Sequence, residues 1–371
     1  MVLRRLYAYS ALQNFAVSLY SPFVGFVAAS LGVPPLLLGV VTSAGTAFNN
    51  IAAFLASLKR AEPLRLILAF NLLASAALAI MATLLEYHVV YTAAYALATA
   101  ALGASGYGWS LVTEKFSRGA RGIRLAEFSF YATAGGLVAT LISGLVLRGG
   151  PLEMKLVLYA AAALIAANAA QIYGLKVKYD EGPRRPRRAG IDKRLLKFYV
   201  DSFFFMVTWS FAWPLFPLAQ VYVLHMTGLQ VAIVQIITVA SNLAFQRFAG
   251  RLFERHRRLS LVLGRATFAL WPFIYGVATN VYQIYAVYLF YGFGGSISNI
   301  AYFAYLVDNA EDRRRAIGYY NLINAAAAIT GSEAASAVLA IAGDQNEELI
   351  RHMLLGAAAA RIAASIPFAF L

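Results

Sequence analysis

Apolar stretches long enough to cross a lipid bilayer follow one another along almost the whole chain. Each has about 20 residues or more, and a helix of that length spans a hydrocarbon core of about 30 Å. Hydrophobic residues make up 61% of the 371 residues and charged residues only 13%, whereas about a quarter of a soluble domain is charged. The sequence therefore predicts an all-α polytopic membrane protein with twelve transmembrane helices. The stretches lie at 6–30, 33–58, 63–85, 88–112, 124–147, 153–174, 197–224, 228–250, 260–279, 281–307, 315–342 and 349–371.

Basic residues gather in alternate connections between these stretches. The connections on the side of the amino terminus hold 25 of the 31 Lys and Arg, whereas the opposite side holds only Arg148, Lys155 and Arg351. Because cytoplasmic loops carry the excess of Lys and Arg, we expect a multi-pass protein of the cell membrane with both termini in the cytoplasm. The same rule accounts for the net charge of +14 without a nucleic-acid partner.

The sequence lacks the residues that several kinds of chemistry require. The chain has no Cys, which excludes disulfides and Cys-based metal sites. There is no Gly-x-x-x-x-Gly-Lys loop to hold ATP phosphates, and the four His lie in or beside loops without metal-ligand spacing. Because no paired carboxylates and no nucleophile–base arrangement are present either, we expect neither an enzyme nor a cofactor or metal.

The segment 175–196 is the longest connection, and it combines two prolines with a run of charges. Such a composition prevents a packed helix. Two interpretations remain, a basic patch that binds lipid or a solvated tether. In either case the segment separates an amino-terminal six-helix half, 1–174, from a carboxy-terminal six-helix half, 197–371.

The two halves resemble each other at an offset near 195 residues. Gly136 falls on Gly331, and Pro22 has a partner in Pro214. Internal repeats of this size indicate two structurally related bundles. Parallel halves of six spans, joined by a long cytoplasmic loop, are the layout of a large class of secondary transporters.

The loop after the eighth stretch carries a short motif, Gly250-Arg-Leu-Phe-Glu254-Arg255-His-Arg257-Arg258. It resembles the loop signature of the major facilitator superfamily, Gly-x-Leu-x-Asp-Arg-x-Gly-Arg-Arg. Glu254 stands where Asp is usual, and Arg257 replaces the second glycine. The resemblance implies that Glu254 and the basic positions hold the cytoplasmic ends of the halves in one conformation, with Gly250 allowing close helix approach. The arginines are equally consistent with a role in topology alone.

The resemblance also implies a substrate cavity formed by spans 1, 4, 7 and 10 and flanked by spans 2, 5, 8 and 11. Polar and aromatic residues near the middle of these spans either bond helix to helix or line that cavity. The candidates are Asn14, Asn49, Asn50, Trp109, Trp209, Trp213, Gln235, Asn242, Asn299, Asn321 and Asn324.

Ionisable residues at membrane depth are functional candidates. Glu333 lies about 12 Å and Arg361 about 18 Å from the outer surface, counted at 1.5 Å per residue. Glu333 is interpreted either as a proton carrier, because protonation would remove the cost of its buried charge, or as the partner of Arg361 in a buried ion pair, which the sequence favours. Asp201, one turn into span 7, is expected to pair with Lys197 or Arg194 near the surface rather than to couple transport.

These observations predict a secondary transporter that moves a small solute by alternating access, with proton coupling as an option and export favoured. The stretch 134–144 has glycines but lacks the Gly-Pro motif that drug–proton antiporters of the superfamily carry in span 5, which argues against a standard drug antiporter. The alternatives are a lipid scramblase or receptor that reuses the fold and, third, a channel. The expected partners are a small-molecule substrate, protons if transport is coupled, and membrane lipids, and the expected state is a monomer.

Overall fold

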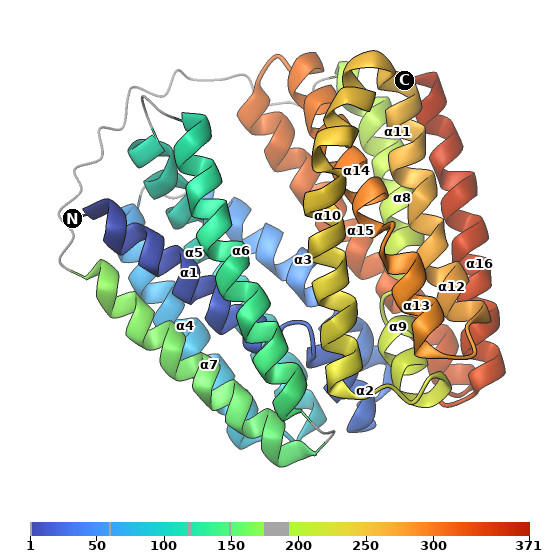
Figure 1. Ribbon diagram of the computed structural model, residues 1–371, viewed down its shortest axis with the longest axis horizontal. Coiled ribbons are helices and arrows are strands. Elements are labelled where there is room, and N and C mark those ends of the chain that lie inside the picture. The colour runs from blue at the N-terminus through green and yellow to red at the C-terminus, as the bar shows by residue number, and fades with distance from the viewer. Residues whose placement is uncertain (1, 59–60, 118–120, 148–149, 174–192) are drawn as a thin grey trace. The chain divides into compact units, whose positions relative to one another are not determined.

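The computed structural model describes residues 2–58, 61–117, 121–147, 150–173 and 193–371, and within these ranges all regular structure is helical (Figure 1). The first helices are α1 (Val2–Tyr20), α2 (Val24–Ser30), α3 (Pro35–Leu58), α4 (Pro63–Thr83), α5 (His88–Ser117), α6 (Arg121–Val146) and α7 (Pro151–Ile172). They are followed by η1 (Lys193–Leu195), α8 (Leu196–Phe211), α9 (Leu215–Leu218), the π-helical turn η2 (Ala219–Val223), α10 (Gly228–Arg255), α11 (Arg257–Ala266), η3 (Thr267–Ala269), α12 (Leu270–Val277), α13 (Val281–Tyr288), α14 (Tyr291–Asn309), α15 (Arg313–Ala342), α16 (Glu347–Ser365) and η4 (Ile366–Phe370). Most of the segment 175–196 lies outside the described residues, so both interpretations of it stay predictions.

Eleven helical stretches in the described ranges are long and apolar enough to cross a membrane. The expected span 281–307 is not among them, because it is divided between α13 and α14 at residues 289–290. The helix α14 is also rich in Gly, Ser and Asn, which lowers its hydropathy. The polytopic all-α prediction is therefore confirmed, and eleven of the twelve expected spans are found as helical stretches able to cross a membrane.

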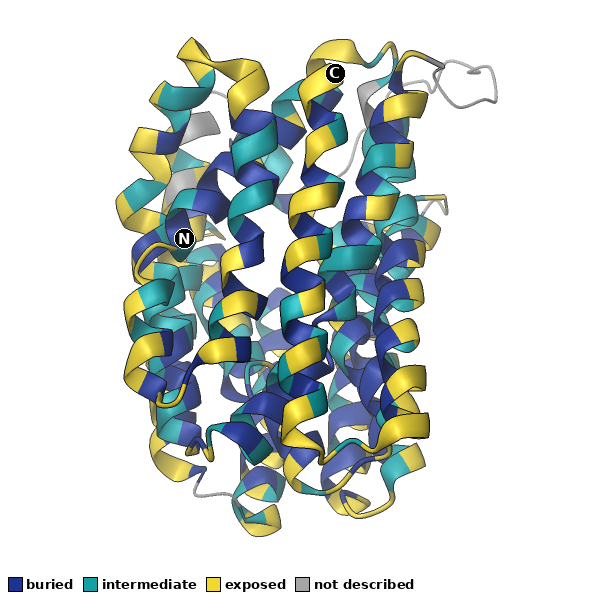
Figure 2. Ribbon diagram, turned by 90° about the vertical axis from the view of Figure 1, so that its right-hand side faces the viewer, coloured by how far each residue is buried: buried dark blue, intermediate teal, exposed yellow. Residues whose placement is uncertain are grey.

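Large apolar side chains remain exposed on many helices. Phe130, Leu152 and Ile341 are 68%, 67% and 89% exposed, and Figure 2 shows exposed faces that run along several helices beside buried faces of the same helices. A soluble protein rarely exposes apolar patches on this scale. These faces are suited to contact with lipid.

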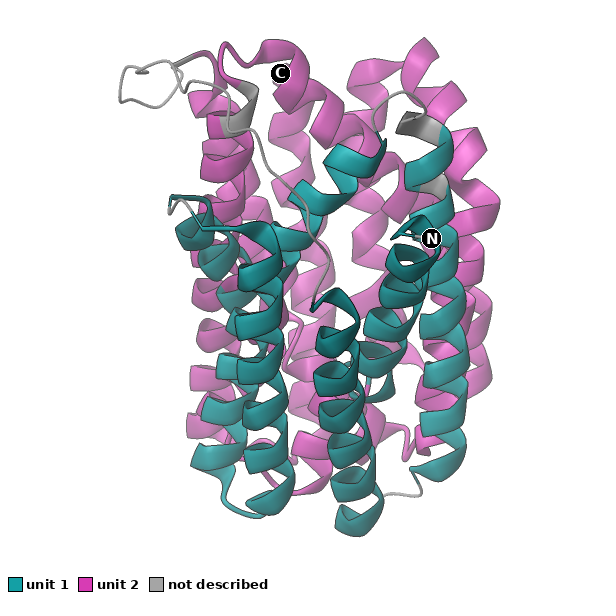
Figure 3. Cartoon of the chain, turned by 90° about the vertical axis from the view of Figure 1, so that its left-hand side faces the viewer, with its two compact units in different colours: residues 1–22, 48–190 teal, residues 23–47, 191–371 magenta. Residues whose placement is uncertain are grey.

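The described chain forms two compact units, which Figure 3 shows in different colours. Unit 1 comprises residues 1–22 and 48–190, and unit 2 comprises residues 23–47 and 191–371. Residues 23–47, which the sequence assigns to the first half, thus pack with helices of the second. The division of the chain at 175–196 stays a prediction.

Proline breaks the first span of each expected half at matching places. The helix α1 ends at Tyr20 and α2 begins at Val24, with Pro22 in the turn between them. The helix α8 likewise ends at Phe211, and α9 begins just after Pro214. Proline has no N–H for the helical hydrogen bond, so both spans are interrupted where the sequence comparison paired them.

Two glycines mark equivalent close approaches between helices. A methyl group at Gly135 in α6 would overlap the carbonyl of Ala11 in α1, and one at Gly331 in α15 would overlap the carbonyl of Val207 in α8. Both residues of the first pair lie 196 positions before those of the second. The packing offset is therefore close to the offset near 195 read from the sequence, but Gly135 and not Gly136 is the packing equivalent of Gly331.

The substitution Gly331→Ala should lower the unfolding temperature of the purified protein in detergent, because an added methyl in a tight contact costs about 1–3 kcal/mol. Gly45→Ala is the matched control, since a Cβ there would meet nothing within 4 Å and Ala favours a helix over Gly by about 1 kcal/mol. Equal shifts in the two variants would contradict the close contact.

Candidate functional site

A network of neutral polar side chains lies in the core of unit 1. The Asn71 Nδ2 atom donates to the Tyr9 hydroxyl at 2.8 Å, and the Ser105 hydroxyl donates to Asn71 Oδ1 at 2.8 Å. Asn168 Nδ2 donates to Gln13 Oε1 at 2.9 Å and to the carbonyl of Tyr9 at 3.1 Å. These bonds join α1, α4, α5 and α7, so the network holds the bundle together.

The amides predicted to line a cavity form no hydrogen bonds that join one helix to another among the described residues. Within the described residues, Asn14 and Asn242 donate only to carbonyls one turn back in their own helices, those of Ser10 and Thr238, and the other candidate amides make no side-chain hydrogen bond to the protein. All of them are half-buried or exposed, and none is fully buried. Their hydrogen-bonding capacity is therefore available to another molecule. This group consists of Asn14, Asn49, Asn50, Gln235, Asn242, Asn299, Asn321 and Asn324.

The three predicted tryptophans pack at the edges of aromatic clusters. Trp109 contacts Tyr9 with ring centroids 4.6 Å apart in unit 1. In unit 2, Trp209 stacks on Phe268 at 4.8 Å and meets Trp213 edge-on at 6.0 Å. Each is half-buried, so part of each ring is available for contact with a ligand.

Arg361 is fully buried in unit 2, and its guanidinium binds carbonyls that helix breaks leave free. It donates to the carbonyls of Phe268 at 2.6 Å and Trp209 at 2.7 Å. Pro272 has no N–H for Phe268, and the N–H that would reach Trp209, that of Trp213, bonds the carbonyl of Ser210 instead. Arg361 thus caps two broken helices.

The ion pair expected between Glu333 and Arg361 is not formed. Neither residue has an ion pair within 4.0 Å among the described residues, and the two printed bonds of Arg361 go to backbone carbonyls. Carbonyls left free where the helices break bind the arginine instead, and sequence spacing does not reveal where those carbonyls point.

Glu333 lies where the start of α3 meets α15, within unit 2. Its Oε1 atom is buried without a hydrogen-bond partner, and a Cβ at Gly39 would come within 2.8 Å of that atom. Next to it, the Ser332 hydroxyl donates to the carbonyl of Gly39 at 2.9 Å and lies 3.0 Å from the Thr42 hydroxyl. The absence of a side chain at Gly39 leaves the space that the carboxyl group occupies.

Asp201 does not form the surface pair expected from the sequence. Lys197 donates to the carbonyl of Phe370 at 2.9 Å, and Asp201 makes no ion pair with any described residue. Its Oδ2 atom is buried without a hydrogen-bond partner. Asp201 is therefore a second acidic side chain in unit 2 with unused hydrogen-bonding capacity.

In the loop motif Gly250–Arg258, the ion pair is formed by Arg257, the residue that replaces the second glycine of the family signature. Arg257 donates to Asp308 at the end of α14 at 3.2 Å. Glu254, Arg255 and Arg258 are exposed and form no ion pair among the described residues. A Cβ at Gly250 would meet no atom of the described residues within 4 Å, so the close helix approach expected there is not seen in this part of the chain.

Arg265 is a buried cation that the sequence analysis missed. Its guanidinium carbon lies 3.8 Å from the centroid of the Tyr302 ring and 4.5 Å from that of Phe205, and Nη2 donates to the Tyr320 hydroxyl at 3.0 Å. Such cation–π contacts offset part of the cost of burying the charge. Arg265 makes no ion pair among the residues the structure describes.

A signal for the missed polar residues is present in the sequence. Asn71 and Arg265 are 194 positions apart, and Asn168 and Arg361 are 193 apart, close to the offset between the halves. Spans 3, 6, 9 and 12 therefore carry polar residues at equivalent places. Apart from Arg361, these residues were not predicted, because their spans were expected neither to form nor to flank the cavity.

The family model described as Major Facilitator Superfamily matches residues 6–332 and, in a second match, residues 200–371. Together the two matches cover nearly all of the chain. No curated protein sequence matches it.

Solved structures with the same fold cover this chain almost completely at low sequence identity. The nucleoside transporter NupG is 14% identical with a TM-score of 0.78, over 99% of this chain and 98% of that one. The POT family transporter PepTSo is 11% identical with a TM-score of 0.78, over 99% and 97%. A bacterial homologue of the human lysosomal transporter Spinster, inward-facing and unoccupied, is 11% identical with a TM-score of 0.66, over 99% and 97%. These similarities confirm the predicted fold class.

Proposed function

This chain belongs to the major facilitator superfamily, and on that premise we propose that it is a secondary transporter of a small polar solute, working by alternating access in the cell membrane. The chain has the fold of a superfamily transporter. The substrate, the driving ion, the direction and the monomeric state are parts of the proposal.

The observation that carries the proposal is the set of unused amides. Asn and Gln side chains in apolar spans are costly unless they are hydrogen-bonded, and in unit 1 the structure bonds Gln13, Asn71 and Asn168. The candidate amides on spans 1, 2, 8, 10 and 11 lack such partners among the described residues. A solute with several donors and acceptors, such as a nucleoside or a short peptide, would supply them; the solved structures of the same fold include transporters of these two kinds.

Glu333 is the proposed proton-coupling residue. Its carboxyl group lies in the contact between the start of α3 and α15, where Gly39, Thr42 and Ser332 join the two helices. The ion pair that would hold it permanently charged is not formed. A change of charge at this position alters the cost of burying the group when the contact is closed, so protonation can be linked to opening.

Uptake by reconstituted vesicles tests this function. We expect saturable uptake of uridine or dialanine, increased several-fold by an inward-directed proton gradient. In Glu333→Gln the stimulation by the gradient should disappear, while exchange of labelled for unlabelled substrate across the membrane is retained, because exchange needs no net proton movement. Glu348→Gln, at the exposed start of α16, is the matched control and should behave as the wild type.

The other functions predict different results in the same vesicles. Movement of a fluorescent lipid between leaflets without saturable solute uptake would support the scramblase and contradict the proposal. Flux that rises linearly with solute concentration would support the channel. Export, which the sequence analysis favours, is tested with vesicles loaded with substrate and carrying the opposite gradient.

A further inference from the structure

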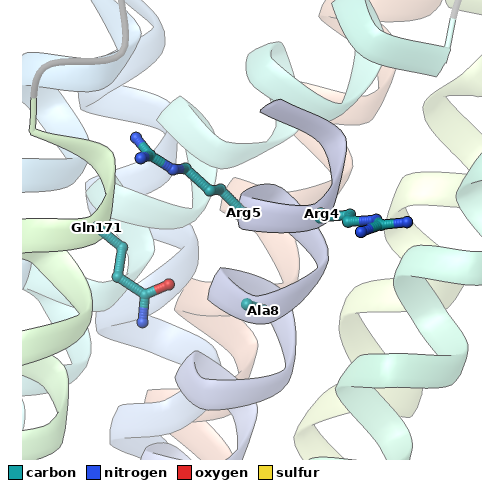
Figure 4. Close-up of a pocket in the computed structure, with 4 residues that line it drawn as sticks. All are labelled: Arg4, Arg5, Ala8 and Gln171. Carbon is teal, nitrogen blue, oxygen red and sulfur yellow. The ribbon is translucent and has the colours of Figure 1, made fainter. Parts of the chain in front are cut away.

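A hollow of about 550 Å³ lies in unit 1 beside the start of α1. It is lined by Arg4, Arg5 and Ala8 of α1 and by Gln171 in the last turn of α7. Figure 4 shows Arg5 and Gln171 reaching into the space between α1 and α7, with Ala8 nearby, while Arg4 points to the other side of α1. The volume falls within the range of about 300–1,000 Å³ typical of small-molecule sites.

The polar groups around this hollow have no partners among the described residues. Arg4 and Arg5 are exposed and form no ion pair or side-chain hydrogen bond with any described residue, and the carboxamide of Gln171 makes no hydrogen bond to the described chain. Two guanidinium groups and one amide therefore offer donors only to an outside molecule. Guanidinium groups bind phosphate oxygens in a bidentate manner, so the hollow favours a phosphate-bearing anion.

The position of the hollow along the span identifies the source of that anion. The start of α1 and the end of α7 lie side by side, since Asn168 of α7 donates to the carbonyl of Tyr9 at 3.1 Å. The arginines lie in the first turn of the candidate span Val2–Ser30, on the side where the basic connections gather. Guanidinium groups at such a boundary lie at the level of lipid headgroups, and the inner leaflet supplies anionic phospholipid there.

We propose that this hollow binds the headgroup of an anionic glycerophospholipid of the inner leaflet. Arg5 and the Gln171 amide contact the phosphodiester together, Arg4 contributes attraction from the other flank, and the small side chain of Ala8 leaves room for the headgroup. The site is separate from the candidate substrate residues and does not depend on the proposed transport function.

Native mass spectrometry of the protein released from nanodiscs tests the proposal. The nanodiscs contain an equal mixture of phosphatidylglycerol and phosphatidylcholine. We expect one phosphatidylglycerol to remain bound at least five-fold more often than phosphatidylcholine. In Arg5→Gln this preference should be lost, with a smaller loss in Arg4→Gln, because only Arg5 lies beside Gln171.

Two further variants distinguish specific binding in the hollow from non-specific attraction of lipid to exposed positive charges. Ala8→Trp keeps both arginines but fills the hollow, and it should lose the bound lipid as Arg5→Gln does. Arg65→Gln/Arg251→Gln removes two exposed charges elsewhere and should retain it. Equal retention of the two lipids by the wild type, or unchanged binding in Ala8→Trp, would overturn the proposal. Competition by 10 mM inorganic phosphate alone would assign the hollow to a soluble phosphate and overturn the lipid assignment.

Discussion

Oxidation of the variant Thr42→Cys/Ser332→Cys should abolish transport, and a reducing agent should restore it. The two hydroxyl oxygens lie 3.0 Å apart, on α3 and α15, so sulfur atoms at these positions need little movement to form a bond of about 2.05 Å. In the proposed cycle the contact between residues 23–47 and α15 opens once per turnover. A covalent link across it should hold the protein in one state and lower uptake by more than ten-fold.

The chain is well suited to this experiment because it has no Cys of its own. Each single variant, Thr42→Cys or Ser332→Cys, should be insensitive to the oxidant and serves as the control for loss of the hydroxyl. A fully linked double variant that still transports at the wild-type rate would show that this contact does not open, and it would contradict alternating access at these residues. Linking is measured as a mobility shift on a non-reducing gel after cleavage between positions 42 and 332.

The contact between residues 23–47 and α15 is built from a few neutral hydrogen bonds. Two hydroxyls and one carbonyl carry its hydrogen bonds. Net contributions of neutral hydrogen bonds are about 0.5–1.5 kcal/mol each. A contact built from such terms can open and close with modest changes in free energy, whereas the paired glycines Gly135 and Gly331 mark contacts within the bundles that should not open.

The sequence predicts the helices, their membrane character and the repeat, because these depend on hydropathy over 20 residues and on Pro and Gly positions. Pro22 and Pro214 illustrate this, since both break spans where the comparison of the halves placed them. The partners of buried charges could not be predicted in the same way. Arg361 was assigned to Glu333 from similar depth, but depth gives no information on the direction of a side chain around its helix.

The candidate substrate residues likewise show which features the sequence predicts and which only the structure reveals. The sequence identifies polar residues within apolar spans, and the structure then separates the bonded amides, such as Asn71, from those with unused capacity, such as Asn324. Arg265 was not among the predicted site residues because its span, 260–279, was expected neither to form nor to flank the cavity. Its surroundings, Phe205 and Tyr302, are distant in sequence and become an aromatic cage only in the folded bundle.

Replacement of Arg361 should be among the most destabilising single changes in this chain. Arg361→Met would leave the carbonyls of Phe268 and Trp209 buried without donors, and each orphaned group costs about 1–3 kcal/mol. Relief from burying the charge offsets part of this loss, so we expect a net destabilisation of about 2–4 kcal/mol. The measurement is the unfolding temperature in detergent, followed by tryptophan fluorescence.

Arg351 offers a matched control on the same helix. It also donates to two carbonyls, those of Gly276 at 3.2 Å and Ala278 at 2.8 Å, but it is half-exposed, so water replaces it in Arg351→Met and the cost should stay below about 1 kcal/mol. Restoring the missing backbone N–H at position 272 tests directly whether the unpaired carbonyl of Phe268 causes the loss of stability. Because Pro272→Ala returns the N–H that Phe268 lacks, Arg361→Met/Pro272→Ala should be more stable than Arg361→Met.

A double-mutant cycle between Arg361→Met and Glu333→Gln distinguishes this carbonyl-capping role from the ion pair that the sequence favoured. Residues that share no contact usually give additive effects within about 0.5 kcal/mol, and additivity is the expected result here. A buried pair would instead show strong coupling, because removing either partner leaves the other charge uncompensated. Coupling well above 1 kcal/mol would restore the pair and would also remove Glu333 from consideration as a proton carrier, since a carboxylate held by an arginine remains ionised. The cycle therefore tests the stability of unit 2 and the proposed coupling residue in one set of measurements.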